Sequence, residues 1–283
     1  MTEQTERTEV QHVVVSTEPG TPPLAPPPVK KDRRALRALL RWTAAVAVFA
    51  AAGGATAYGI TRPERTDLPW LATASDGRWE YPRLVKPPLP SGSPGPFAEG
   101  NSTGTHYADL RALLLPAPDG ARADATLRGT DGWLPTRTFL AEFAGQGDRK
   151  ELGQLLTDYG LRHVAARGWS TPDGTRTRIY LLQFDTAAVA DEFLSSKLID
   201  YSAPRYALSG AAEVARDDYP GAAQVEDVKH QVFAEAKPYG AEQVREAYLS
   251  AGDTLALIVQ SRKGGAKAVP FQQTIVLQSQ LLG

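Results

Sequence analysis

The stretch LRHVAARGWSTPDGTRTRIYLLQF, residues 161–184, predicts the architecture of the folded part of this chain. Its two halves alternate polar and apolar residues, and Asp173-Gly174 between them is a common hairpin turn. Residues 179–182 are an unbroken apolar run, which is typical of a strand at the centre of a sheet. We therefore predict an antiparallel β-hairpin here.

A helix is predicted directly after this hairpin, because Thr186 can cap the apolar-periodic residues that follow it. The same order recurs near the C-terminus. Strands flank Gly252-Asp253, and a helix with Pro270 in its first turn follows them. A hairpin–helix unit thus occurs twice and predicts an α+β, two-layer domain with an antiparallel sheet. The two units span residues 162–198 and 244–282.

Three further helices are expected before the first hairpin, and one of them is a short helix in TRTFLAEFAG that Thr136 would cap and Gly145 would end. Residues 107–114 place a tyrosine and three leucines on one helical face, and Pro116 stops this pattern. In DRKELGQLLTDYG, Asp148 and Glu151 have the spacing of a capping box, and Gly160 is placed to end the helix.

A nineteen-residue stretch without charges, WTAAVAVFAAAGGATAYGI, runs from Trp42 to Ile60. A helix needs about 20 mostly apolar residues to cross a bilayer. The preceding residues, Lys30 to Arg41, are strongly basic, and basic residues stay on the cytoplasmic side. We expect one transmembrane helix over residues 35–60, with the N-terminus in the cytoplasm and the C-terminal domain outside.

A cleaved signal peptide is the competing interpretation of this stretch. Ala55-Thr56-Ala57 matches a small-residue cleavage site, so a mature protein could begin after Ala57. The basic region before the apolar core would then be far longer than usual, which favours an uncleaved anchor. Both interpretations place the folded part outside the membrane.

Composition divides the rest of the chain. Residues 1–34 are polar and Pro-rich and are expected to form a disordered cytoplasmic tail. Residues 61–105 are rich in Pro, Gly and Ser and predict an extracytoplasmic stalk, within which residues 75–84 are suited to dock onto the domain. Residues 106–283 are expected to form the globular domain.

The charge and cysteine content exclude several classes of function. Residues 61–283 carry 24 Lys and Arg against 27 Asp and Glu, so this part lacks the basic surface that nucleic-acid binding needs. The chain has no cysteine, which excludes disulfides, thiol catalysis and Cys-based metal sites. The membrane is the partner that the basic flank of the apolar stretch predicts.

No motif for catalysis, phosphate binding or metal binding is present in the sequence. His106 and Asp109 share a helical spacing but lack a third ligand, and the acidic pairs Asp217-Asp218 and Glu226-Asp227 lack the spacing of a calcium loop. We expect no cofactor, no metal and no enzymatic activity. The alternative is an envelope enzyme without recognisable catalytic motifs.

The hairpin also provides the candidate binding residues. His163, Arg167 and Trp169 alternate on the first strand, and Arg176, Arg178 and Tyr180 alternate on the second. If the two faces coincide, cations and aromatic rings lie side by side, which suits an envelope protein or a glycan-like ligand. The alternative is that the aromatic rings belong to the core. The predicted binding residues are Trp169, Arg176 and Arg178.

Several stretches resemble uncharacterised single-pass, membrane-anchored envelope proteins of high-GC actinobacteria. They are ATASDGRWEYPRL at 72–84, DLRALLLPAPDGA at 109–121, RHVAARGWSTPDGT at 162–175 and AGDTLALIVQSRKGGAKAVPF at 251–271. The resemblance covers most of residues 35–283. It implies an anchored ectodomain and supplies no catalytic residues.

Overall fold

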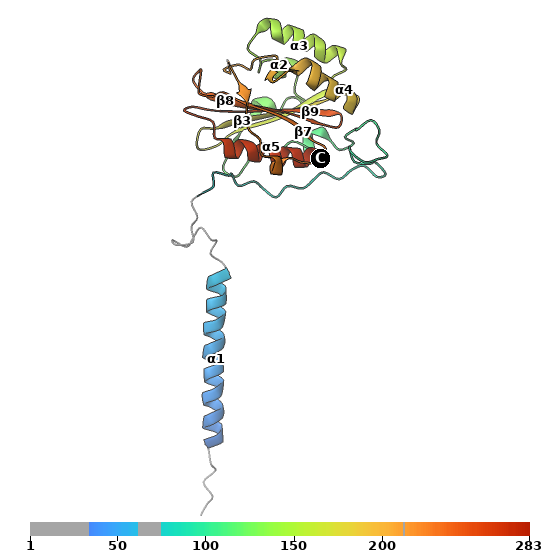
Figure 1. Ribbon diagram of the computed structural model, residues 1–283. Coiled ribbons are helices and arrows are strands. Elements are labelled where there is room, and N and C mark those ends of the chain that lie inside the picture. The colour runs from blue at the N-terminus through green and yellow to red at the C-terminus, as the bar shows by residue number, and fades with distance from the viewer. Residues whose placement is uncertain (1–33, 62–74, 212) are drawn as a thin grey trace, which may run out of the picture. The chain divides into compact units, whose positions relative to one another are not determined.

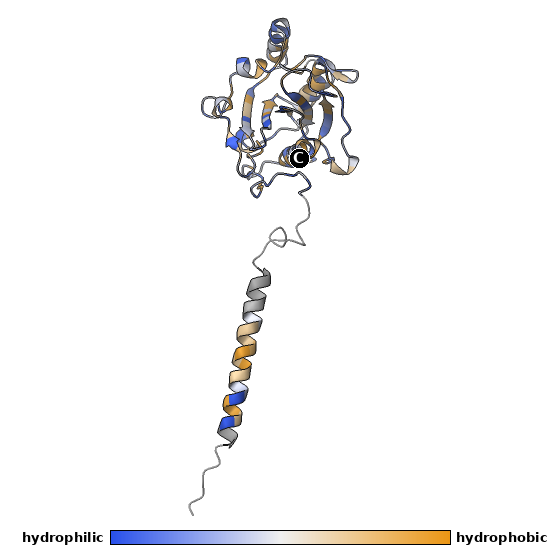
Figure 2. Ribbon diagram, turned by 90° about the vertical axis from the view of Figure 1, so that its left-hand side faces the viewer, coloured by the Kyte–Doolittle hydropathy of each residue, from blue (hydrophilic) through white to orange (hydrophobic). Residues whose placement is uncertain are grey.

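The computed structural model describes residues 34–61, 75–211 and 213–283. The chain divides into two compact units, Met1–Thr73 and Ala74–Gly283. In the first unit, α1 spans Arg34–Thr61, and Figure 2 shows hydrophobic residues along part of it.

Among the described residues, no helix combines the length and the hydropathy needed to cross a membrane. Several predicted features lie outside the described residues. These are the tail up to residue 33, the side chains of residues 35–36 and 55–60 in the expected anchor, and the stalk residues 62–74.

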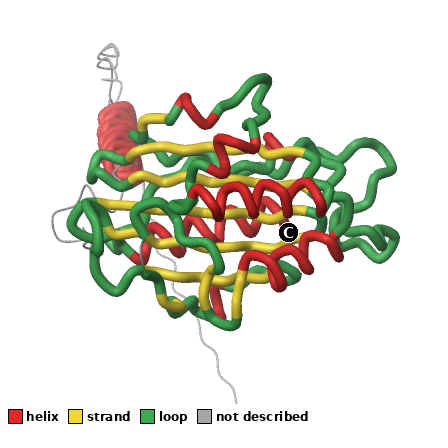
Figure 3. The backbone as a smooth tube through the Cα atoms, turned by 90° about the horizontal axis from the view of Figure 1, so that it is seen from above, coloured by secondary structure: helices red, strands yellow, loops and turns green. Residues whose placement is uncertain are grey.

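A seven-stranded antiparallel sheet forms the centre of the second unit, in the order β1-β2-β3-β9-β8-β7-β6 (Figures 1 and 3). The two long hairpins predicted from the sequence lie next to each other in it, because β3 pairs with β9. The predicted α+β class with an antiparallel sheet is confirmed. The strands of this sheet are β1 (Arg122–Ala123), β2 (His163–Ser170), β3 (Arg176–Gln183), β6 (Ala215–Arg216), β7 (Lys229–Ala234), β8 (Gln243–Ala251) and β9 (Thr254–Arg262).

Helices cover both faces of the sheet, so a third layer is added to the two that were expected (Figure 1). One face packs against α2 (Thr136–Leu140), α3 (Gln146–Asp158) and α4 (Ala187–Phe193), and its core is rich in Phe and Tyr. The other face packs against α5 (Ala268–Leu282) and has a mostly aliphatic core. A short two-stranded sheet, β4 (Ile199–Asp200) with β5 (Ala203–Pro204), lies after α4 and η4 (Leu194–Leu198).

The strand register decides which side chains share a face. Arg178 of β3 lies opposite Val259 of β9, which lies opposite Glu246 of β8. Arg176 lies in the next row, opposite Ser261. Directly opposed residues of an antiparallel sheet point to the same side. These side chains therefore all lie on the face covered by α2, α3 and α4.

The compact unit takes in residues 75–105, which were expected to belong to the stalk. The predicted docking of residues 75–84 is seen at Trp79, whose backbone forms two hydrogen bonds of 2.8 Å with the side chain of Gln273 in α5. Asn101 is buried and holds the following turn with its side-chain amide. The domain boundary therefore lies near residue 74 rather than at 106, because these side chains are bound to the core.

Two local expectations need correction, and a third is confirmed. Residues 107–114 form only a short 3-10 turn, η2 (Leu110–Ala112), because three consecutive leucines at 113–115 are all buried against the sheet, which one helical face cannot achieve. Helix α3 begins at Gln146 after Gly145, two residues before the expected cap Asp148. The predicted cap of α4 is confirmed: Thr186 accepts a hydrogen bond from the Val189 N–H at 3.3 Å.

Candidate functional site

A cleft of about 210 Å³ lies at the end of the sheet where β3 begins, on the face covered by α2, α3 and α4. We call it the Arg176 cleft. Strands β3, β8 and β9 form its floor, and two loops, at residues 209–210 and 241–242, form its rim. Its lining includes Arg176, Arg178, Ser209, Glu242, Val244 and Ser261.

Each arginine of this cleft is paired with a glutamate. Arg176 Nη2 donates to Glu242 Oε2 at 2.7 Å. Arg178 Nε lies 3.0 and 3.1 Å from the two carboxylate oxygens of Glu142. Burial alone would raise the pKa of Glu242, but the hydrogen bond from Arg176 holds that pKa below its ordinary value. The cleft therefore presents positive and negative groups side by side and carries little net charge.

Tyr180 also holds Glu142 in place, because its hydroxyl donates to Glu142 Oε1 at 2.5 Å. Burial, together with the charge of Glu142, raises the pKa of Tyr180. The backbone of Glu142 also accepts a hydrogen bond of 2.6 Å from the Ser209 N–H, so the rim loop is tied to the same residue. This network holds Arg178 in one orientation beside the cleft.

A buried carboxyl group lies on the same face, in the row of Arg178 and two strands away from it. Glu246 is 1% exposed and lies between Phe233 and Val259 in the sheet. Burial, followed by the charge of Glu235, raises the pKa of Glu246 to about 8. Glu235 Oε2 accepts a hydrogen bond of 2.7 Å from the Val244 N–H. Glu246 does not line the cleft, so in this structure it has no access to a ligand there.

Trp169 does not belong to this cleft, which corrects one of the three predicted binding residues. The side chain is 1% exposed and contacts Tyr81 edge-on, with ring centroids 6.5 Å apart. Because Trp169 lies opposite Thr177, it points to the α5 face, whereas Arg176 and Arg178 point to the other face. The faces that were expected to coincide are opposite ones, and Trp169 is a core residue.

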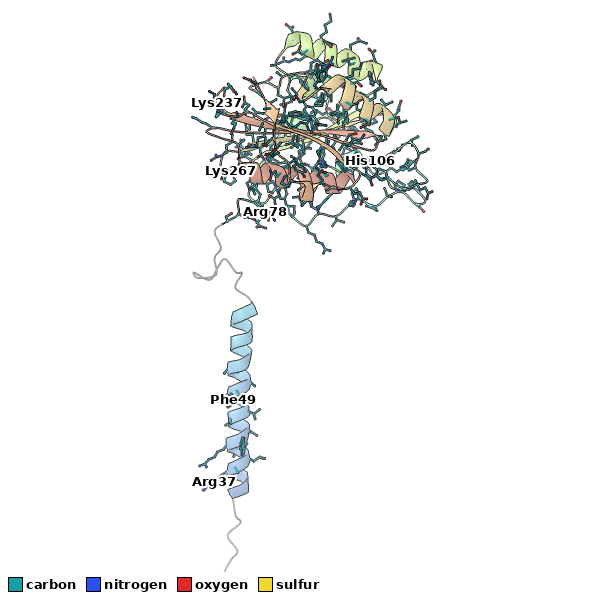
Figure 4. The ribbon with its side chains drawn as sticks, in the orientation of Figure 1. Arg37, Phe49, Arg78, His106, Lys237 and Lys267 are labelled. Atoms are coloured by element: carbon teal, nitrogen blue, oxygen red, sulfur yellow. The ribbon has the colours of Figure 1, made fainter. Side chains whose placement is uncertain are left out.

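His106 has a partner that the sequence did not indicate. Its ring Nδ1 lies 2.7 Å from Asp253 Oδ1, and its Nε2 lies 2.9 Å from the Leu282 carbonyl oxygen. The side chains of His106 and Asp253 are both buried, and the side-chain amide of Gln183 donates to Asp253 Oδ2 at 3.0 Å. This network joins His106 to the turn between β8 and β9 and to the end of α5. His106 is labelled in Figure 4. The network is a structural clamp and does not involve Asp109.

The acidic pairs considered as cation ligands have other surroundings. Asp217 forms an ion pair with Arg245. Within the described ranges, no group of three His, Asp or Glu residues is arranged to hold a metal ion. The chemistry available in the Arg176 cleft is hydrogen bonding by two guanidinium groups, the Glu242 carboxylate and the Ser209 hydroxyl. The paired glutamates and the two lining serines carried no sequence signal, because they come from loops and distant strands.

No protein-family model and no curated protein matches the sequence. Among solved structures, the chain is similar to the extracellular domain of PknH from Mycobacterium tuberculosis, with a TM-score of 0.31 and 10% identity over 58% of this chain and 79% of that one. It is also similar to an uncharacterised protein from Mycobacterium smegmatis, with a TM-score of 0.29 and 10% identity over 59% and 79% of the two chains.

Proposed function

We propose that this protein is a single-pass, membrane-anchored protein whose C-terminal domain lies outside the membrane and binds a cell-envelope ligand without catalysing a reaction. The ligand site is the Arg176 cleft. The observation that carries this proposal is the pairing of Arg176 and Arg178 with Glu242 and Glu142 around a concave surface.

A glycan-like ligand suits this arrangement. Sugar hydroxyls both donate and accept hydrogen bonds, and the cleft offers guanidinium donors beside carboxylate acceptors. Ser209 adds a hydroxyl group, and Val244 supplies an apolar part of the floor, in which the Ser261 hydroxyl is buried. A purely anionic ligand would have to compete with the two glutamates for the same guanidinium groups. A volume of about 210 Å³ accommodates one ring or side group of a larger ligand rather than a whole drug-sized molecule.

The binding test uses the full chain in detergent and fragments of purified cell-wall glycan. We expect saturable binding that is weakened roughly tenfold or more by Arg176→Ala combined with Arg178→Ala, since two charge-assisted hydrogen bonds are lost. The control is Arg137→Ala, which removes an exposed arginine of α2 outside the cleft. Equal weakening by the control, or no binding by the unmodified chain, would contradict the proposal.

Catalysis is the competing outcome of the same experiment. Mass spectrometry of the glycan fragments after incubation shows whether covalent bonds have been cleaved. Unchanged fragments that nevertheless bind agree with the proposal. Cleavage that disappears in the Arg176→Ala, Arg178→Ala variant would assign an enzymatic role to the same cleft.

The anchor and its orientation rest on the uncharged stretch from Trp42 to Ile60 and the basic residues before it. Protease treatment of intact cells is expected to digest the C-terminal domain while sparing a tag fused to residue 1. Release of a domain that begins after Ala57 would replace the anchor by a cleaved signal peptide. Protection of the C-terminal domain in intact cells would contradict the proposed orientation.

A further inference from the structure

We propose that a second cleft, at the outer edge of β2, binds a phosphate group. We call it the Arg167 cleft. It has a volume of about 190 Å³ and is lined by Arg111, Asp124, Arg128, Ala166, Arg167 and Gly168, among others. This size is below the range typical of sites for drug-sized ligands and suits a small group of a ligand. The site is separate from the Arg176 cleft, so the two proposals stand independently.

Arg167 is the central residue of this cleft. Its side chain is partly buried, and burial lowers the pKa of its guanidinium. Nη1 donates to the Leu114 carbonyl oxygen at 2.8 Å, which fixes the orientation of the group. Within the described part of the chain, no carboxylate lies within ion-pair distance of Arg167. A partly buried cation without a counter-ion is costly, and a bound anion relieves that cost.

Two further arginines contribute positive charge. Arg128 is exposed and, like Arg167, has no carboxylate partner among the described residues. Arg111 is held by Asp109, with Nη2 2.6 Å from Oδ2, and its guanidinium lies 4.8 Å above the ring of Trp133. Arg111 is therefore a rigid, neutralised wall of the cleft, whereas Arg128 and Arg167 supply charge that a ligand can use.

One carboxylate lines the cleft and has its own partners. Asp124 Oδ1 accepts hydrogen bonds of 2.9 Å from the Thr126 N–H and 2.6 Å from the Thr126 hydroxyl. It caps the short turn η3 (Ala125–Leu127) and forms no ion pair with Arg128 or Arg167 in the described structure. Asp124 lowers the positive potential of the cleft but does not occupy its guanidinium groups.

The edge of β2 adds a backbone donor. The carbonyl oxygens of Val164 and Gly168 point to this edge, since they accept hydrogen bonds of 2.8 Å from Leu134 and Asp124. Backbone groups of alternate residues in a strand point to the same edge. The N–H of Ala166 therefore faces the cleft between those two bonds. Guanidinium groups beside a backbone N–H form the set of donors with which proteins bind phosphate oxygens.

The test measures binding of inorganic phosphate to the full chain in detergent by isothermal titration calorimetry. We expect one site, with affinity reduced roughly tenfold or more in Arg128→Ala and in Arg167→Gln, because each removes a charged donor. Arg128 is exposed, so its variant remains informative even if Arg167→Gln unfolds. Arg137→Ala is the control and should bind like the unmodified chain.

A second arm identifies the source of the phosphate. Flotation with vesicles of anionic phospholipid, compared with zwitterionic vesicles, is carried out in the presence and absence of inorganic phosphate. Anionic-vesicle binding that Arg128→Ala reduces assigns a lipid headgroup, and phosphate binding without vesicle binding assigns a soluble or glycan-linked phosphate. Absence of both, or equal loss in Arg137→Ala, overturns the proposal. The variant Arg176→Ala with Arg178→Ala should retain phosphate binding, which separates this outcome from a failure at the other cleft.

Discussion

The two arginine clefts of this domain differ in how their charges are balanced. In the Arg176 cleft, each guanidinium is engaged by a glutamate at 2.7–3.0 Å. In the Arg167 cleft, Arg128 and Arg167 have no carboxylate partner among the described residues, and the lining Asp124 is bound to Thr126. A neutralised pair offers donors and acceptors together, whereas an unneutralised arginine favours an anion. The same residue type thus supports two different kinds of recognition.

The largest expected effect is the difference in unfolding free energy between a variant of the core residue Trp169 and a variant of the cleft residue Arg176. Trp169→Ala should lower the free energy of unfolding by about 3–5 kcal/mol, because a fully buried indole leaves a large cavity. Arg176→Ala on the next strand should lower it by less than about 1 kcal/mol, since its ion pair is largely exposed. Denaturant unfolding of both variants measures this difference. Similar losses in the two variants would mean that the faces of the hairpin have been assigned incorrectly.

The second prediction concerns the pH dependence of stability and Glu246, the buried carboxyl group in the row of Arg178. The pKa of Glu246 is raised from its ordinary 4.5 to about 8, so the folded protein keeps a proton that the unfolded chain releases. Stability from this group is present below pH 4.5 and is lost as the pH rises through 8, by on the order of 5 kcal/mol. Glu246→Gln should remove most of this pH dependence. An unchanged slope of unfolding free energy against pH would exclude Glu246 as its source.

The third prediction compares how much stability is lost when either glutamate that pairs with an arginine of the Arg176 cleft is removed. Glu142→Ala should cost about 2 kcal/mol of stability, because Arg178 and the Tyr180 hydroxyl both lose a partner in a partly buried setting. Glu242→Ala should cost less than about 1 kcal/mol, since its partner Arg176 is more exposed. Thermal melts of both variants measure the difference, and the reverse order would contradict the assigned networks.

The smallest expected effect is a change in phosphate affinity at the Arg167 cleft. Asp124→Asn removes one negative charge beside Arg128 and Arg167 while keeping an oxygen that can cap η3. We expect phosphate to bind about two- to fivefold more tightly, which corresponds to roughly 0.5–1 kcal/mol for a charge at this range in a solvated site. Asp119→Asn, an exposed change outside the cleft lining, is the control. Weaker phosphate binding in Asp124→Asn would argue against an anion site.

Much of the fold was predictable from local patterns. The hairpin around Asp173-Gly174, the capped helix after Thr186 and the second hairpin–helix unit are encoded by turn residues and hydrophobic periodicity within short windows. The segment at residues 107–114 was predicted incorrectly because periodicity is ambiguous in a leucine-rich run. The leucines there are buried by contact with the sheet, which no local pattern reports.

The candidate sites were less predictable. Arg176 and Arg178 were found because they alternate along one strand, but Trp169 was assigned to their face incorrectly. The face of each strand depends on pairing register, and register follows from the whole sheet. Glu142, Asp253 and Asp124 gave no signal, since each meets its partners or its cleft only after distant segments pack together.

The sequence by itself determined the α+β class, the two hairpin–helix units and an uncharged stretch behind a basic flank, because each depends on residues close together in the chain. Only the tertiary structure decided that the helices cover both faces and that residues 75–105 belong to the compact unit. It also decided that Arg176 pairs with Glu242, whereas Arg167 donates to the Leu114 carbonyl oxygen. Those properties depend on which surfaces meet. The free energy of burying a side chain or pairing a charge is set by neighbours that lie far away in the sequence.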